Sequence, residues 1–307
     1  MDTVSRRPSD VTLPVGVESW EDLTRLAEEL PGWVFRGQRE HCWRLETTLE
    51  RFVARHSIQA PLANVEQMIL GPFQQRVSQV ILDPPSAEDA MSWLGTIQHY
   101  GGPTRLLDFT YSLPVATFFA LEEEPQSKRC VVWAVNDMVV RKILADVLVD
   151  EEGKPISCED AFAAGDLLNS TIGARFSGPV AAAGLPRLYT ERQRIQDGLY
   201  LFGLNPEYSL EQNLYGMFGV APSDVYPENM VGWFTNPLGK SVLQKLRRRP
   251  VIKIFVDTEI RPALIDELAM AGVSRETLFP VDDEAPHGVQ ETLTEILEEF
   301  LEEQGKL

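Results

Sequence analysis

The spacing of apolar and polar residues predicts helices and strands along most of the chain. One face of apolar positions at helical spacing is expected at 18–30, 47–57, 64–81, 86–100, 258–272 and 288–303. Short apolar runs bounded by turn residues predict strands at 33–37, 104–109, 130–136, 194–205 and 250–257. A short buried helix is expected at 114–123, opened by Ser112 and Pro114, and Ser86 is the expected N-cap of the helix at 86–100.

This order of elements favours an α+β fold. Strands and helices are mixed without regular βα alternation, which predicts a mixed central β-sheet with flanking helices. Residues 1–17 are expected to form a flexible leader, and residues 18–303 a single domain without internal repeats.

Composition and charge narrow the functional classes. The chain has 307 residues, of which 44% are apolar and 24% charged, enough for a sizeable buried core. No apolar run approaches the ~18–20 residues that cross a bilayer, and the first residues lack the apolar core of a signal peptide, so we expect a cytoplasmic protein without a membrane partner. The net charge of −18 opposes binding to a nucleic-acid backbone. Three widely spaced cysteines indicate neither a disulfide framework nor a zinc site, and no metal site is expected.

Residues 34–38, "VFRGQ", place an arginine at the end of an apolar strand. A guanidinium is costly to bury unless an anion meets it, and its planar fork of donors suits a carboxylate or a phosphate. Arg36, Gly37 and Gln38 are therefore candidate ligand-binding residues, with Gly37 allowing a ligand or a neighbouring backbone to approach closely. The alternative is that Arg36 forms an internal salt bridge.

Residues 96–120 concentrate hydrogen-bonding side chains beside apolar segments. Such groups must be satisfied by one another or by a ligand. The candidates are Gln98, His99, Tyr100, Thr104, Arg105, Asp108 and Thr110. Asp108 is the expected internal partner of Arg36 or Arg105, and His99 is a candidate general base. Thr110 has the alternative role of a helix cap.

Residues 187–203 form a third polar segment before aromatic residues. Arg192 is a candidate ligand-binding residue, and strand alternation would place Gln196, Gly198 and Tyr200 on one face. The alternative is a solvated strand edge.

With these segments in order, the chain resembles the FRG-domain family, named for its Phe-Arg-Gly tripeptide. The resemblance rests on Phe35-Arg36-Gly37, on "QHYGGPTRLLDFTYSLPVATFFA" and on Arg192 with Gln196 and Gly198. It extends over roughly residues 18–300 and implies a single FRG domain.

The order of the segments also resembles that of arginine-type ADP-ribosyltransferases. Those enzymes have a hydrophobic-Arg-Gly strand end that binds the dinucleotide, a Ser/Thr-rich strand before a helix, and a later strand with a catalytic carboxylate. The resemblance implies an ADP-ribosyltransferase-like fold, NAD as the ligand, contact between Arg36 and an NAD phosphate or ribose, and an unknown macromolecular acceptor. Thr104 or residues 110–112 would stand at the second position. Gln196, an amide with Glu191 nearby, stands at the third.

Three functions remain open at this point. The first is a nucleotide-using transferase or glycohydrolase with Gln196, Asp108 and His99 as candidate catalytic residues. The second is a sensor module that binds a small anionic ligand without chemistry and in which the Arg36–Asp108 cluster is structural. The third is a hydrolase or nuclease using His99 and Asp108, which the acidic charge and the absence of a motif such as HExxH oppose.

Overall fold

The computed structural model describes residues 11–147, 168, 178–225, 245–279 and 288–306, and within them it forms one mixed sheet flanked by helices. The strands are β1 (Thr12–Val17), β2 (Trp33–Gln38), β3 (Leu107–Thr110), β4 (Arg129–Asn136), β5 (Ala181–Gly184), β6 (Gly198–Gly203) and β7 (Val251–Asp257). The larger helices are α2 (Trp20–Glu29), α3 (Thr48–Arg55), α4 (Leu62–Val77), α5 (Ala90–His99), α6 (Leu113–Leu121), α7 (Asp137–Val147), α14 (Arg261–Met270) and α16 (Val289–Glu303). Short helices are α10 (Glu191–Ile195), α11 (Leu210–Gly216), α12 (Pro222–Val225), η1 (Thr258–Ile260) and α15 (Arg275–Leu278). The expected α+β class is confirmed.

The sheet has the strand order β1-β7-β4-β2-β3-β6-β5. β1 runs parallel to β7, and the other neighbouring pairs are antiparallel. Thr12–Val17 therefore correct the expectation of a flexible leader, because these residues form an edge strand of the sheet; residues 1–10 lie outside the described part of the chain. Val11, Val15 and Val17 are buried there, which gives this short segment a reason to order.

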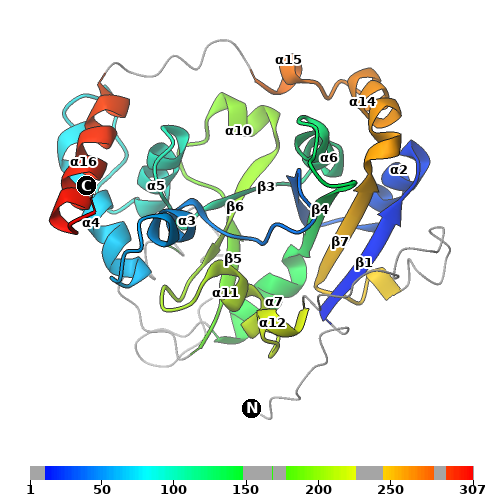
Figure 1. Ribbon diagram of the computed structural model, residues 1–307, viewed down its shortest axis with the longest axis horizontal. Helices are drawn as coiled ribbons and strands as arrows, with labels where there is room; N and C mark the ends of the chain where they lie inside the picture. The colour runs from blue at the N-terminus through cyan, green and yellow to red at the C-terminus, as the bar shows by residue number, and fades with distance from the viewer. Residues whose placement is uncertain (1–10, 148–167, 169–177, 226–244, 280–287, 307) are drawn as a thin grey trace.

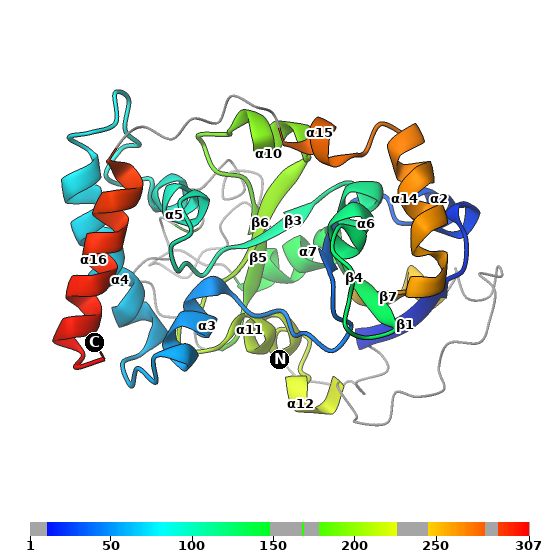
Figure 2. The same ribbon diagram turned by 45° about the horizontal axis from the view of Figure 1, so that its top comes forward.

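Helices pack at both ends of the sheet and over its faces (Figures 1 and 2). α2, α6 and α14 pack with the β1–β7–β4–β2 half around one core cluster that includes Leu23, Phe35, Ala116 and Leu264. α4, α5 and α16 build a second cluster at the β6 end, around Phe73, Trp93 and Phe300. A third cluster packs α11 against Trp133, Leu201 and Phe255 of the sheet.

Local capping explains where several helices begin. Ser112 accepts a hydrogen bond from the Val115 amide, at the helix start that the sequence predicted, and Ser19 accepts one from the Asp22 amide. The expected cap at Ser86 is wrong: α5 begins at Ala90, and the side chain of Asp89 accepts from the Ser92 amide. Asp89 also accepts from the Ser92 hydroxyl at 2.7 Å, so this carboxylate satisfies two donors of the first turn.

Strands β2 and β3 diverge in the middle of the sheet, and this divergence positions the site. They are paired only at Phe35 and Thr110, whereas β2 pairs with β4 along its whole length. On the sides where β2 and β3 face each other, backbone groups beyond Phe35 on β2 and before Thr110 on β3 therefore have no ladder partner from the other strand. The sheet opens at Arg36 of β2, one residue beyond the Phe35–Thr110 pair.

Candidate functional site

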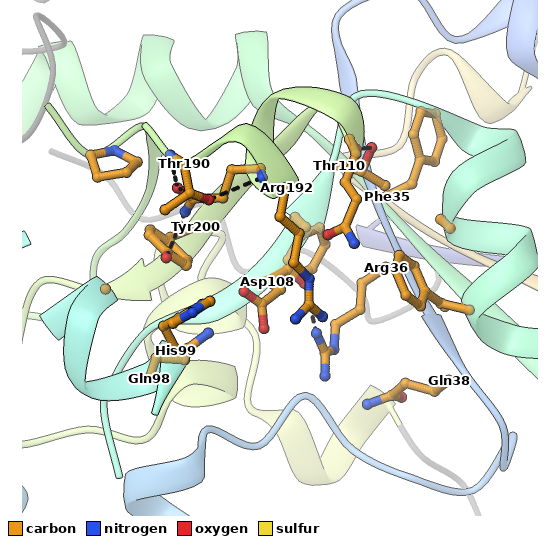
Figure 3. Close-up of a pocket in the computed structure, with 18 of the residues that line it drawn as sticks. Phe35, Arg36, Gln38, Gln98, His99, Asp108, Thr110, Thr190, Arg192 and Tyr200 are labelled. Carbon is orange, nitrogen blue, oxygen red and sulfur yellow. Dashed lines mark hydrogen bonds between the residues drawn. The ribbon is translucent and has the colours of Figure 1, made fainter. Parts of the chain in front are cut away.

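A large pocket lies where β2 and β3 separate (Figure 3). Its volume is ≈ 1200 Å³, and its walls come from β2, the 39–51 segment, α5, β3, α6 and the 186–196 segment. Ten of the sequence candidates line it: Arg36, Gly37, Gln38, Gln98, His99, Tyr100, Asp108, Thr110, Arg192 and Gln196. Segments separated by 60 or more residues thus converge on one cavity, as expected for a small-molecule site.

The guanidinium of Arg36 is half-buried in this pocket, and no described carboxylate pairs with it. Its Nη1 donates to the backbone carbonyl of Asp108 at 2.7 Å, and its Nε is enclosed without a hydrogen-bond partner. Burial lowers the pKa of Arg36, the charge of Asp108 opposes that shift, and nearby Arg51 adds to the lowering. The expected ion pair with Asp108 is therefore corrected to a bond with that residue's main chain. The Asp108 carbonyl has no hydrogen-bond donor from β2, because the two strands diverge there, and the Arg36 side chain donates to it instead.

Asp108 places its carboxylate in the pocket. It pairs with Tyr200 across β3 and β6, so the two side chains are neighbours on the sheet surface. In the view of Figure 3, Asp108 lies between His99 on one side and Arg36 on the other. Within the described residues its carboxylate forms no hydrogen bond or ion pair. Burial raises the pKa of Tyr200 and the charge of Asp108 adds to the rise, which keeps that hydroxyl protonated while it accepts from Gln193 at 2.6 Å.

Five arginines line the pocket, and they differ in what neutralises them. Arg39 pairs with Glu123, and Arg44 pairs with the buried Glu211 at 3.1 Å. Arg36, Arg51 and Arg192 form no ion pair with any residue in the described segments. Arg51 was not a sequence candidate, because its position in the amphipathic 47–57 segment gave it no distinguishing pattern. Carboxylates line the pocket too: Glu123 pairs with Arg39 and Glu122 with Arg275, so the three arginines without an ion pair share the pocket with Glu46, Asp83 and Asp108.

Gly37 meets a neighbouring backbone. A Cβ at this position would stand 1.9 Å from the Ala116 carbonyl oxygen and 2.6 Å from the Ala120 nitrogen. Only a glycine allows α6 to pack this closely on β2. Gln38 is also committed within the protein: its Nε2 donates to the Arg44 carbonyl at 3.0 Å, and its Oε1 accepts from Trp133 Nε1 at 2.7 Å.

Thr104 and Arg105 do not line the pocket. Thr104 is fully buried and donates to Gln98 Oε1 at 2.5 Å, which holds the amide of Gln98 at the pocket wall. Arg105 corrects the expected pairing with Asp108, because its Nε donates to the two carboxylate oxygens of Glu66 at 2.9 and 2.7 Å. Both residues lie outside the pocket and pack behind its wall, where their hydrogen bonds stabilise it.

Gln196 does not lie on a strand. It is the C-cap of α10, and β6 begins only at Gly198, so the predicted shared strand face is wrong. Its side-chain Nε2 donates to the Leu278 carbonyl at 3.0 Å, and its own carbonyl accepts from the Thr110 hydroxyl at 2.7 Å. The sequence held a signal for this helix: Thr190 and Gln193 form a reciprocal capping box.

Tyr100, His99 and Arg192 complete the wall. His99 is exposed, and its ring meets Tyr100 edge-on at 5.0 Å. The Arg192 guanidinium lies over the Phe279 ring at 4.5 Å. Among the described residues, no group of three or more His, Cys, Asp and Glu side chains is placed to hold a metal ion. None of the helices in the described ranges is long and apolar enough to span a bilayer.

Comparison with known proteins identifies the part of the chain that builds much of this pocket. No curated protein and no solved structure matches the sequence, so the ADP-ribosyltransferase-like resemblance stays a prediction. Residues 31–129 match the family profile of the FRG domain. That range holds β2 with Arg36, the α5 wall, β3 with Asp108 and α6. The chain therefore carries an FRG domain over residues 31–129.

Proposed function

We propose that the pocket binds an anionic, nucleotide-like molecule whose phosphate groups meet Arg36 and Arg192. The observation that carries this proposal is the guanidinium of Arg36, which is half-buried, has an unpartnered Nε and lacks a carboxylate partner among the described residues. A cation in that position is stabilised by an anion that enters the pocket. Arginine is also the side chain best suited to bidentate contact with phosphate.

The dimensions and walls of the pocket favour a nucleotide over a small carboxylate. Its volume of ≈ 1200 Å³ lies above the usual ~300–1,000 Å³ of ligand pockets, which leaves room for a dinucleotide. Tyr100, Phe119 and the exposed Trp43 add aromatic surfaces on which a base can stack. NAD is the dinucleotide we propose, and an unknown macromolecule is its proposed acceptor.

Asp108 is the residue we propose for transfer chemistry. In an ADP-ribosyl transfer the bond between the ribose C1′ and the nicotinamide nitrogen breaks, and its electron pair leaves with nicotinamide. The carboxylate of Asp108 would stabilise the positive charge that develops on the ribose. A nucleophile of the acceptor, or water, then bonds to C1′ and gives up its proton to a base, for which His99 is the exposed candidate.

A second candidate function is ligand binding without turnover. Gln196, which motif order places at the catalytic carboxylate, is an uncharged amide already bonded to the Leu278 carbonyl. An amide held in this way has no charge to offer an oxocarbenium ion, which favours a sensor module.

Titration calorimetry with NAD, combined with an assay of nicotinamide release, tests both candidates. Arg36→Gln should weaken NAD binding by about 10- to 100-fold, since a hydrogen bond to a charged group contributes about 1.5–3 kcal/mol. The matched control is Arg39→Gln, because Arg39 also lines the pocket but pairs with Glu123. Equal loss in both variants would show only a general effect of charge and would contradict the assignment.

The reaction is tested with Asp108→Asn. We expect NAD to bind this variant while nicotinamide release falls by about 100-fold or more. Binding by the wild type without any release would favour the sensor function. Absence of NAD binding by the wild type would overturn the proposal.

A further inference from the structure

The segment around α15 supports the pocket from outside. The ring of Phe279 lies under two guanidinium groups, that of Arg192 at 4.5 Å and that of Arg275 at 5.1 Å. Phe119 meets the same ring edge-on at 6.0 Å with an interplanar angle of 83°. Arg192 and Phe119 line the pocket, whereas Phe279 does not. Phe279 therefore stands behind two of the pocket's side chains.

Two contacts fix this segment in place. The Leu278 carbonyl accepts from Gln196 Nε2 at 3.0 Å, and Gln196 is in turn bonded to Thr110 of β3. Arg275 pairs with Glu122 at the end of α6. α15 is thereby joined to α10, to the strand that bears Asp108, and to the helix that packs on Gly37.

Stacking has a particular consequence for an arginine that is to bind an anion. A long flexible side chain loses conformational entropy when a ligand immobilises it, and a side chain already held in place loses less. A cation–π contact uses the face of the guanidinium, so the N–H donors in its plane stay available. Figure 3 shows Arg192 extending from α10 into the pocket toward Asp108 and Arg36.

We propose that Phe279 is a positioning residue of the ligand site, whose ring orients the Arg192 guanidinium toward the bound anion. The site then includes a residue 150 positions beyond the end of the FRG match at Arg129. The identity of the anion rests on the proposed function, but the positioning of Arg192 does not.

The ligand-free protein gives the first test. In a ¹⁵N–¹H spectrum, the Arg192 Nε–H resonance is identified by its absence from Arg192→Gln. We expect it to be shifted by the Phe279 ring current and to show little fast motion. Phe279→Leu should remove both properties, and Phe279→Tyr should keep them. An Arg192 resonance that is the same in Phe279→Leu as in the wild type would overturn the inference.

The second test is a double-mutant cycle with ADP-ribose as the probe. Phe279→Leu should weaken binding roughly three- to tenfold in the wild type and leave it unchanged in Arg192→Gln, with Phe279→Tyr restoring affinity. Equal losses in both backgrounds would contradict a role through Arg192. If the wild type binds no ADP-ribose, the proposed ligand is wrong, and the resonance experiment alone decides the role of Phe279.

Discussion

Arg36 and Arg105 differ in the group that each contacts, and this difference separates a candidate ligand-binding residue from a structural one. Arg36 faces a backbone carbonyl, whereas Arg105 is paired with Glu66, whose exposed fraction is only 1%. The Arg105 side chain is 11% exposed, so both charges are largely removed from water. Loss of one partner from such a pair leaves an uncompensated buried charge.

The Glu66–Arg105 pair therefore predicts a large stability effect. Glu66→Gln should lower the free energy of unfolding by about 3–5 kcal/mol, as measured by urea denaturation. The control is Arg76→Gln, which breaks the exposed pair with Glu299 and should change stability little. Similar small losses of unfolding free energy in both variants would contradict a large stabilising contribution from the buried Glu66–Arg105 pair.

Gly37 predicts a second residue-scale effect. Gly37→Ala forces α6 away from β2 and should cost at least about 1–3 kcal/mol of unfolding free energy, the range for overpacking. Gly184→Ala is the matched strand variant, because its Cβ would meet neighbours no closer than 3.5 Å. Chemical denaturation that ranks the two variants equally would contradict the close approach of α6.

At the residue scale, the sequence predicted which residues line the pocket better than it predicted their hydrogen-bond and ion-pair partners. The Phe-Arg-Gly and 96–110 candidates mostly meet at the pocket, because strand ends next to apolar runs were readable from the pattern. Their partners were not: Glu66 lies 39 positions from Arg105, and Leu278 lies 82 from Gln196. Such pairings depend on the packing of distant elements, which no local pattern records.

At the scale of elements, β1 shows how a short edge strand is held. It has six residues, and every one pairs with β7. Its segment contains Pro14 and Gly16, residues that weaken a strand pattern. Tertiary pairing with β7 and burial of its valines overcome that weak propensity.

A buried valine tests β1. Val17 is fully packed against the core, so Val17→Ala should lower the unfolding free energy by about 2 kcal/mol through lost burial and the cavity left behind. Glu18→Ala, at an exposed position just beyond the strand, is the control and should have little effect. Unchanged stability in Val17→Ala, measured in urea, would mean that this segment does not belong to the core.

Most of the larger helices were predicted from the sequence, whereas α7 was missed. Their apolar faces and caps are local features, as Ser19 and Ser112 show. α10 was missed because its five residues are too few to show a period, although the Thr190–Gln193 capping box was present. The divergence of β2 from β3 could not be predicted from the sequence either, because two strands that pair at a single position show no corresponding pattern in their residues.

At the scale of the whole molecule, this acidic protein has a lysine, Lys253, buried in strand β7 of the sheet. Lys253 is 3% exposed, lies over the Trp133 ring at 4.2 Å, and has its pKa lowered to about 8, chiefly by burial and against the charge of Glu211. The class of the fold was predictable from the order of the elements, but the placement of this lysine was not.

Lys253 predicts a pH dependence of stability. Its pKa is about 8 in the folded protein, against an ordinary value of 10.5 in the unfolded chain, so between these values the unfolded chain binds more protons. Stability from this group therefore rises as pH increases from about 8 to 10.5, by up to about 3 kcal/mol. Lys253→Met removes that dependence and should equal or exceed the wild type at pH 7. Urea unfolding at several pH values checks this, and parallel curves for the two proteins would contradict it.

The most direct test of an uncompensated cation at Arg36 is the melting temperature of Arg36→Gln with and without ADP-ribose. A ligand site predicts a variant that melts within about 4 °C of the wild type, or higher, because only one hydrogen bond to the Asp108 carbonyl is lost and a half-buried charge is removed. It also predicts that ADP-ribose raises the melting temperature of the wild type and not that of the variant. A variant that melts many degrees lower, with no response to ADP-ribose in either protein, would contradict this function and make Arg36 a structural residue.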